Sequence, residues 1–125
     1  MNVVDSGAWL EYFADGPKAA FFAPAIAATE KLVVPTLSLC EVFKRVLQQR
    51  NEDDALMAVA TMQQGTVVDL DADIALSAAR ISIDCRLPMA HSVILATAKA
   101  SEATLWTQDE HFKGLPGVKY RPARG

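Results

Sequence analysis

Short apolar strands that alternate with helical segments most constrain the fold of this chain. Runs rich in β-branched residues occur at MNVVD (1–5), KLVVP (31–35), TVVDL (66–70) and ATLWTQD (103–109), with VKY (118–120) as a shorter fifth candidate. Between these runs, helical spacing and composition predict helices over 8–13, 17–31, 37–49, 53–64, 72–85 and 89–101. Continuous apolar strands separated by helices are typical of a parallel sheet covered on both faces. We therefore expect an α/β fold of three layers, α/β/α, with a central, mainly parallel sheet whose ligands bind at the carboxyl ends of the strands.

The composition narrows the class of protein further. At 125 residues, 51% of them hydrophobic, the chain suits one domain with one core, over residues 1–125. It has no apolar run near the roughly 20 residues that span a bilayer and no basic leader, so we expect a cytoplasmic location without membrane contact. The net charge of −3 argues against a simple nucleic-acid coat, but not against an enzyme with an acidic metal pocket. Cys40 and Cys85 have no CxxC spacing, and we expect both to be reduced, buried thiols.

Three carboxylates stand at the predicted ligand-binding edge of the sheet. Asp5 ends the first strand, Asp109 follows the fourth, and Glu41 lies in the first turns of the helix after the second strand. Carboxylates that converge without a cation repel one another and raise each other's pKa values. A divalent cation such as Mg²⁺ removes that repulsion, and it can activate water and neutralise phosphoryl charge. The pattern therefore favours a metal site.

Each of these acids also has a purely structural interpretation. Asp5 is suited to be the N-cap of the helix that follows it. Glu41 completes a capping-box pattern with Ser38, in SLCE. Asp109 is suited to a turn in TQDE, where its side chain would bind its own backbone. Taken one at a time, the acids leave the structural and the metal-binding interpretations open.

Four segments, in order along the chain, resemble those of PIN-domain ribonucleases. They are VVDSGAWLEYF (3–13), VPTLSLCEVFKRV (34–46), LPMAHSVILATA (87–98) and LWTQDEHF (105–112). In length and layout the chain looks most like the VapC-type toxins of bacterial toxin–antitoxin pairs. The resemblance implies an acidic pocket that binds Mg²⁺ or Mn²⁺, hydrolysis of RNA phosphodiester bonds, and inhibition by a cognate VapB-type antitoxin.

The resemblance also implies roles for individual residues. Asp5 and Glu41 match the first two acids of the pattern. Asp109 matches the acid of the "T.D..F" segment, with Thr107 beside it as a substrate contact. Asp5 and Asp109 would hold the ion. The fourth catalytic position falls on His91, where the pattern has an aspartate.

Three interpretations of His91 in such a pocket stay open. A neutral imidazole would be a metal ligand, and it would favour Mn²⁺ or Zn²⁺ over Mg²⁺. A protonated imidazole would partly replace the metal charge, because neighbouring carboxylates stabilise it. A general acid or base near neutral pH is the third. We hypothesise a weakened metal site, and the alternative to a nuclease is an inactive PIN-fold protein that acts by binding an antitoxin or RNA. A receiver-type phosphoryl site is disfavoured, because no lysine directly follows LWT.

Surface contacts are predicted from charge and from aromatic residues. Arg86 and Lys113 are the preferred RNA contacts because both lie in predicted loops at the active edge, and Lys44 and Arg45 are further candidates. The basic tail VKYRPARG (118–125) is predicted to be disordered. The first two helices carry five aromatic residues, which suit either the core or an interface with an antitoxin or a second copy in a homodimer. These are Trp9, Tyr12, Phe13, Phe21 and Phe22.

Overall fold

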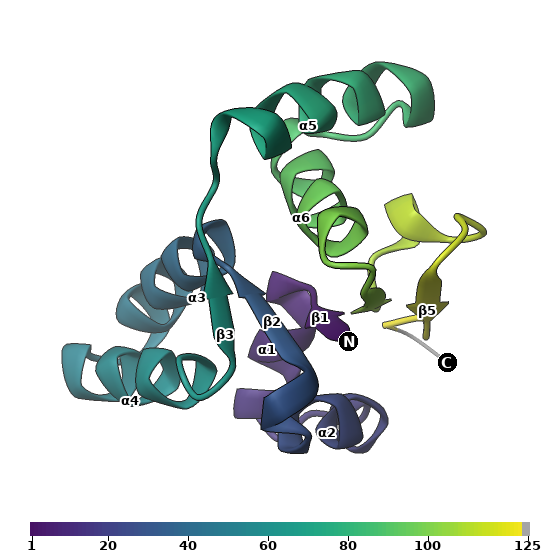
Figure 1. Ribbon diagram of the computed structural model, residues 1–125. Helices are drawn as coiled ribbons and strands as arrows, with labels where there is room; N and C mark the ends of the chain where they lie inside the picture. Colours follow the sequence, from purple (N-terminus) through teal and green to yellow (C-terminus); the bar gives the residue numbers. More distant parts are fainter. Residues whose placement is uncertain (124–125) are drawn as a thin grey trace.

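The computed structural model describes residues 1–123 as strands and helices that alternate along the chain (Figure 1). The strands are β1 (Asn2–Val4), β2 (Leu32–Pro35), β3 (Thr66–Val68), β4 (Thr104–Thr107) and β5 (Val118–Tyr120). The helices are α1 (Ser6–Phe13), α2 (Ala19–Ala27), α3 (Thr36–Gln49), α4 (Glu52–Met62), α5 (Ala72–Cys85) and α6 (Met89–Ala100). Two short 3₁₀ turns follow α2 and β4, at η1 (Thr29–Lys31) and η2 (Glu110–Phe112).

The five strands form one parallel sheet in the order β3-β2-β1-β4-β5. β1 lies in the middle, where Val3 pairs with Val33 on one side and Leu105 on the other. The backbone N–H of Asp5 continues this ladder by donating to the carbonyl of Trp106 at 2.9 Å. Asp5 is therefore held at the centre of the carboxyl edge of the sheet.

The two faces of the sheet carry separate helical layers, which confirms the expected three-layer α/β/α fold (Figure 1). Successive residues of a strand point to opposite faces. Val3 accordingly joins the core under α5 and α6, and Val4 joins the core under α1 to α4.

The helix boundaries follow the expected pattern with one clear exception. α5 occupies the predicted residues, 72–85. The single helix expected over 17–31 is instead α2 followed by η1, because Ala28 leaves the helical conformation with ψ of 69°. Residues 118–120 form β5, which confirms the fifth strand candidate and contradicts the expectation that the tail is disordered from residue 118. Residues 124–125 lie outside the described part of the chain.

The cysteines are free, but they are not both buried as expected. α3 buries the stripe that contains Ser38, Val42 and Val46. Cys40 lies two positions from both Ser38 and Val42, whereas residues on the same helix face are three or four positions apart. It therefore falls on the opposite, exposed face of the helix. Cys85, at the end of α5, is half-buried.

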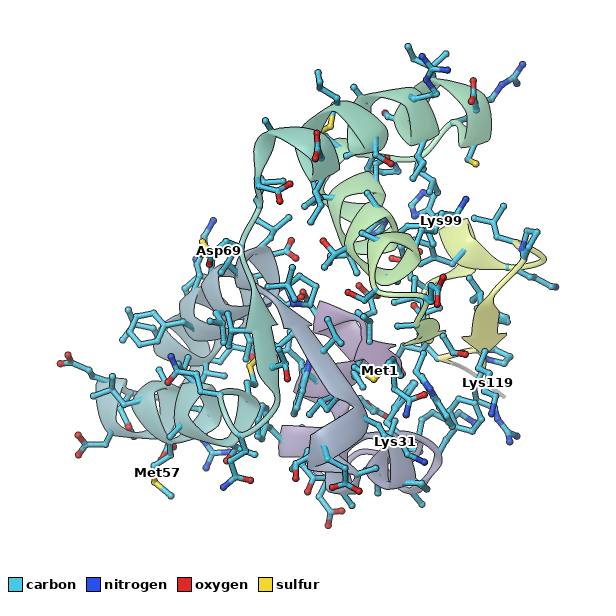
Figure 2. All side chains as sticks on the ribbon, viewed as in Figure 1. Met1, Lys31, Met57, Asp69, Lys99 and Lys119 are labelled. Atoms are coloured by element: carbon cyan, nitrogen blue, oxygen red, sulfur yellow. The ribbon has the colours of Figure 1, made fainter. Side chains whose placement is uncertain are left out.

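The aromatic residues of α1 and α2 belong mainly to the core. Trp9 and Phe22 are fully buried, and Phe13 stacks on Trp9 with ring centroids 5.6 Å apart. Large exposed apolar side chains lie elsewhere, and Met57 on α4 projects away from the molecule (Figure 2). Within residues 1–123, the helices are too short or too polar to cross a membrane.

Candidate metal centre at the carboxyl edge of the sheet

An open cleft of about 720 Å³ lies at the carboxyl edge of the sheet. It brings together Asp5 from the end of β1 and Glu41 from α3. His91 from the first turn of α6 and Asp109 from the segment after β4 line the same cleft. All four residues expected to be catalytic thus meet, although they come from positions spread over most of the sequence.

Asp5 is almost completely buried, with 3% of its surface exposed. It occupies the N-cap position of α1, but its side chain makes no capping hydrogen bond there, so the capping interpretation is wrong. Its Oδ2 atom instead accepts a hydrogen bond from the Thr107 hydroxyl at 3.0 Å. Burial raises the pKa of the Asp5 carboxyl, while the bond from Thr107 and the proximity of His91 act in the opposite direction. A cation beside Asp5 would stabilise its carboxylate form.

Glu41 is oriented by the helix on the other side of the cleft. Its Oε1 atom accepts a hydrogen bond from the hydroxyl of Ser6 at 2.8 Å, which links α3 to α1. The capping-box interpretation is wrong because α3 begins at Thr36, which places Ser38 inside the helix. The Ser38 hydroxyl is buried without a hydrogen-bond partner among the described residues.

Thr107 connects the two aspartates. Its hydroxyl donates to Asp5 and accepts from the backbone N–H of Asp109 at 2.9 Å. Thr107 is 0% exposed, so it cannot touch a substrate, and the expectation of a substrate contact has to be corrected. Its place in the structure is that of a positioning residue.

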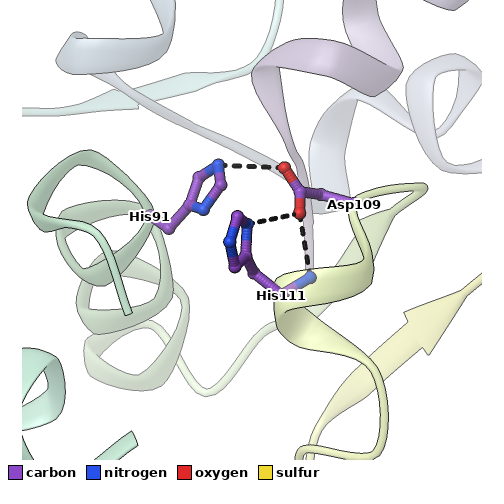
Figure 3. Close-up of side chains that lie close together, drawn as sticks. All are labelled: His91, Asp109 and His111. Atoms are coloured by element: carbon purple, nitrogen blue, oxygen red, sulfur yellow. Dashed lines mark hydrogen bonds and ion pairs between the residues drawn. The ribbon is translucent and has the colours of Figure 1, made fainter. Parts of the chain in front are cut away.

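Asp109 is a turn residue and a site residue at once. Its Oδ1 atom accepts from the backbone N–H of His111 at 2.9 Å, and this turn brings the His111 ring back to the same oxygen, with Nδ1 at 2.9 Å. On the other side, Nε2 of His91 lies 3.2 Å from Oδ2 of Asp109 (Figure 3). His111 is not among the site residues expected from the sequence. The available signal was the turn pattern itself, because an Asx turn folds the residue two positions later back onto the aspartate.

The cations that line the cleft come from a helix and not from the loops. Lys44 and Arg45 line it together with Glu41, because positions three and four residues apart share one helix face. Arg86 and Lys113 are exposed, and within residues 1–123 neither contributes to this cleft. The structure therefore does not support their selection as the preferred RNA contacts.

The donor set fits a divalent cation. Three carboxyl groups converge on one cleft, one of them buried with a raised pKa, and oxygen donors of this kind suit Mg²⁺ and Mn²⁺. Thr107 joins the carboxylate of Asp5 to the backbone of Asp109, which keeps the two residues side by side at the cleft.

Comparison with known proteins gives one family and a set of solved structures. The PIN domain family model matches residues 3–118. A search of curated proteins returned no significant match. A toxin–antitoxin complex from Klebsiella pneumoniae is 22% identical, with a TM-score of 0.79 over 95% of this chain and 96% of that chain. The sarcin–ricin loop cleaving toxin VapC20 of Mycobacterium tuberculosis is 15% identical, with a TM-score of 0.79 over 98% and 100% of the two chains. DNA-bound VapBC from Salmonella typhimurium is 14% identical, with a TM-score of 0.74 over 97% and 96%.

Proposed function

The chain belongs to the PIN domain family, and from this premise we propose that it is a metal-dependent endoribonuclease toxin. In this proposal one domain, over residues 1–125, hydrolyses RNA phosphodiester bonds in the cytoplasm and is neutralised by a cognate VapB-type antitoxin. The observation that carries the proposal is the meeting of Asp5, Glu41 and Asp109 in one cleft at the carboxyl edge of the sheet.

Asp5 and Asp109 are the proposed ligands of a Mg²⁺ or Mn²⁺ ion. When bound, such an ion neutralises charge on the scissile phosphate and activates water for attack on phosphorus. Thr107 links the carboxylate of Asp5 to the backbone N–H of Asp109 through its two hydrogen bonds. Glu41, held by Ser6, faces the cleft and is the proposed acceptor of the proton that the attacking water loses.

Lys44 and Arg45 are the proposed contacts for the RNA backbone. Both are exposed, and both lie on the face of α3 that lines the cleft. Phosphate contacts of this kind supply much of the affinity for a nucleic acid and make it sensitive to salt.

The proposed partners are an antitoxin and a second copy of the chain. Support for the antitoxin comes from similar solved structures that are toxin–antitoxin complexes. An apolar groove between α1, α3 and α4 is the proposed antitoxin site, with Phe13 and Met57 in its wall and Arg50 and Asp54 at its rim. The exposed apolar face of α5 is the proposed homodimer contact.

Cleavage of a structured RNA by the antitoxin-free protein tests the proposal. We expect cleavage that requires added Mg²⁺ or Mn²⁺ and that is lost in Asp5→Asn and Glu41→Gln. Asp84→Asn is the matched control, because Asp84 is an exposed acid of α5 away from the cleft, and it should cleave like the parent protein. Cleavage that survives unchanged in Asp5→Asn would contradict the proposal.

A catalytically weakened PIN-fold protein that acts by binding is the second candidate. The specific observation is that an imidazole, His91, stands at the carboxylate of Asp109, where the family pattern has a further acid. If His91 weakens the site, His91→Asp should cleave RNA faster than the parent protein at equal Mg²⁺. Equal rates would show that the histidine does not impair the site.

A further inference from the structure

Asp109 and the two histidines of the chain form a compact cluster of potential metal ligands. One ligand atom from each of His91, Asp109 and His111 lies within 4.8 Å of the other two. The three residues come from α6, from the segment after β4 and from η2, and both imidazoles approach the same carboxylate (Figure 3). The cluster thus combines two nitrogen donors with one carboxylate beside the buried Asp5.

The distances in this cluster match the edges of a coordination sphere. Nitrogen and oxygen atoms bound to one transition-metal ion at about 2.0–2.2 Å lie about 2.9–3.5 Å from each other. The contacts of Asp109 with His91 and with His111 are 3.2 Å and 2.9 Å. The two imidazoles contact different oxygens of Asp109 and have ligand atoms no more than 4.8 Å apart, so binding to one ion requires them to approach each other by up to about 1.3–1.9 Å. The side chain of His111 is 53% exposed, which leaves it room for that movement.

The environment of His91 allows the tautomer that a metal requires. Its Nε2 atom faces Asp109, and its Nδ1 atom is buried without a hydrogen-bond partner among residues 1–123. A metal ion at Nε2 would take the place of the proton that this atom directs at Asp109, and the ring proton would move to Nδ1. The ring packs against Phe112, with centroids 4.9 Å apart, which keeps Nε2 directed at the cleft.

We propose that His91, Asp109 and His111 bind a first-row divalent transition-metal ion, and that this site prefers such ions to Mg²⁺. Imidazole nitrogen suits Zn²⁺, Ni²⁺ and related ions, whereas Mg²⁺ takes oxygen ligands and keeps much of its water. This inference deepens the proposed function and rests on it, because it names the class of metal at the proposed catalytic cleft. It adds His111 as a ligand and gives His91 a binding role in place of the missing acid.

Calorimetric titration with the metal ion alone tests the affinity. The protein would be the full, metal-free chain with Cys40→Ser, so that the exposed thiol does not take up Zn²⁺. We expect one Zn²⁺ per chain, bound roughly 100-fold more tightly than Mg²⁺. His111→Ala and His91→Ala should each weaken Zn²⁺ binding about tenfold or more, whereas Glu110→Gln, an exposed neighbour in the same turn, should not.

Nitrogen NMR of the imidazoles tests the ligand identities, and it does not depend on RNA cleavage. Because the chain has two histidines, the variants His91→Asn and His111→Asn assign both rings without ambiguity. Zn²⁺ should shift a ring nitrogen of each histidine at one equivalent. A shift in one ring or in neither, or equal affinities for Zn²⁺ and Mg²⁺, would overturn the inference. Zn²⁺ bound through both rings in a protein that cleaves no RNA would support the site and contradict the nuclease.

Discussion

The hydroxyl group of Thr107 is predicted to hold the two aspartates of the cleft in place, and Thr107→Val isolates that contribution. Valine retains the shape of the side chain at this fully buried position but removes the hydroxyl. Oδ2 of Asp5 loses its donor and the backbone N–H of Asp109 loses its acceptor. A buried polar atom left without a partner costs about 1–3 kcal/mol, and the half-buried amide adds less. We therefore expect the free energy of unfolding to fall by about 2–4 kcal/mol.

Thr107→Ser is the matched control. It retains both hydrogen bonds and removes one buried methyl group, so the loss should be about 1 kcal/mol. Urea unfolding at neutral pH, followed by circular dichroism, measures both variants. A Thr107→Val protein as stable as Thr107→Ser would refute the assignment of Thr107 as the link between Asp5 and Asp109.

Three further predictions concern pH, packing and RNA. The pKa of Asp5 is raised in the folded protein, so ionisation of this carboxyl opposes folding. The stability that the protonated carboxyl contributes is therefore lost as pH rises from the ordinary aspartate pKa through the raised, folded-state pKa. The stability of the parent protein minus that of Asp5→Asn, measured by urea unfolding across this range, should therefore decrease with pH, and a constant difference would contradict the raised pKa. Gly65→Ala places a Cβ atom 2.8 Å from a backbone oxygen of β2, so it should lower the free energy of unfolding by about 1–3 kcal/mol. The loss should appear as a lower melting temperature, and an unchanged melting temperature would exclude the clash. The double variant Lys44→Ala/Arg45→Ala should weaken RNA binding and reduce the slope of log K against log salt by about 1–2, whereas Arg86→Ala should leave both nearly unchanged. The opposite result would show that RNA contacts the loop residue Arg86 and not the helix residues Lys44 and Arg45.

The fold was predictable because its strands and helices have distinct apolar periods. α5 was predicted over the residues it occupies. In the structure Asp71 caps its start by accepting from Ile74, and Arg86 ends it with a left-handed φ of 55°. The segment 17–31 was less predictable. Its alanine-rich composition is compatible with one long helix, and the break at Ala28 depends on how the chain must turn into β2.

The site was predictable where it depends on topology, and less so where it depends on side-chain direction. Asp5 and Asp109 follow adjacent parallel strands, so their meeting follows from the sheet order. His111 was missed because its position depends on a turn formed by the Asp109 side chain. Thr107 was given the wrong role because its burial is a property of the packed fold. Lys44 lines the cleft because it lies three residues after Glu41, on the same face of the helix. This position could be predicted from the sequence spacing alone.

The spread of the site over the two helical layers has a consequence for the synthesis of the protein. Asp5 directly follows the first strand and Glu41 belongs to the layer on one face, whereas His91 belongs to the layer on the other face. A ribosome that has translated the chain as far as α6 has not yet added Asp109, and β4, which positions it next to β1, is also missing. Any activity of this cleft therefore begins only after β4 and Asp109 have been added to the growing chain.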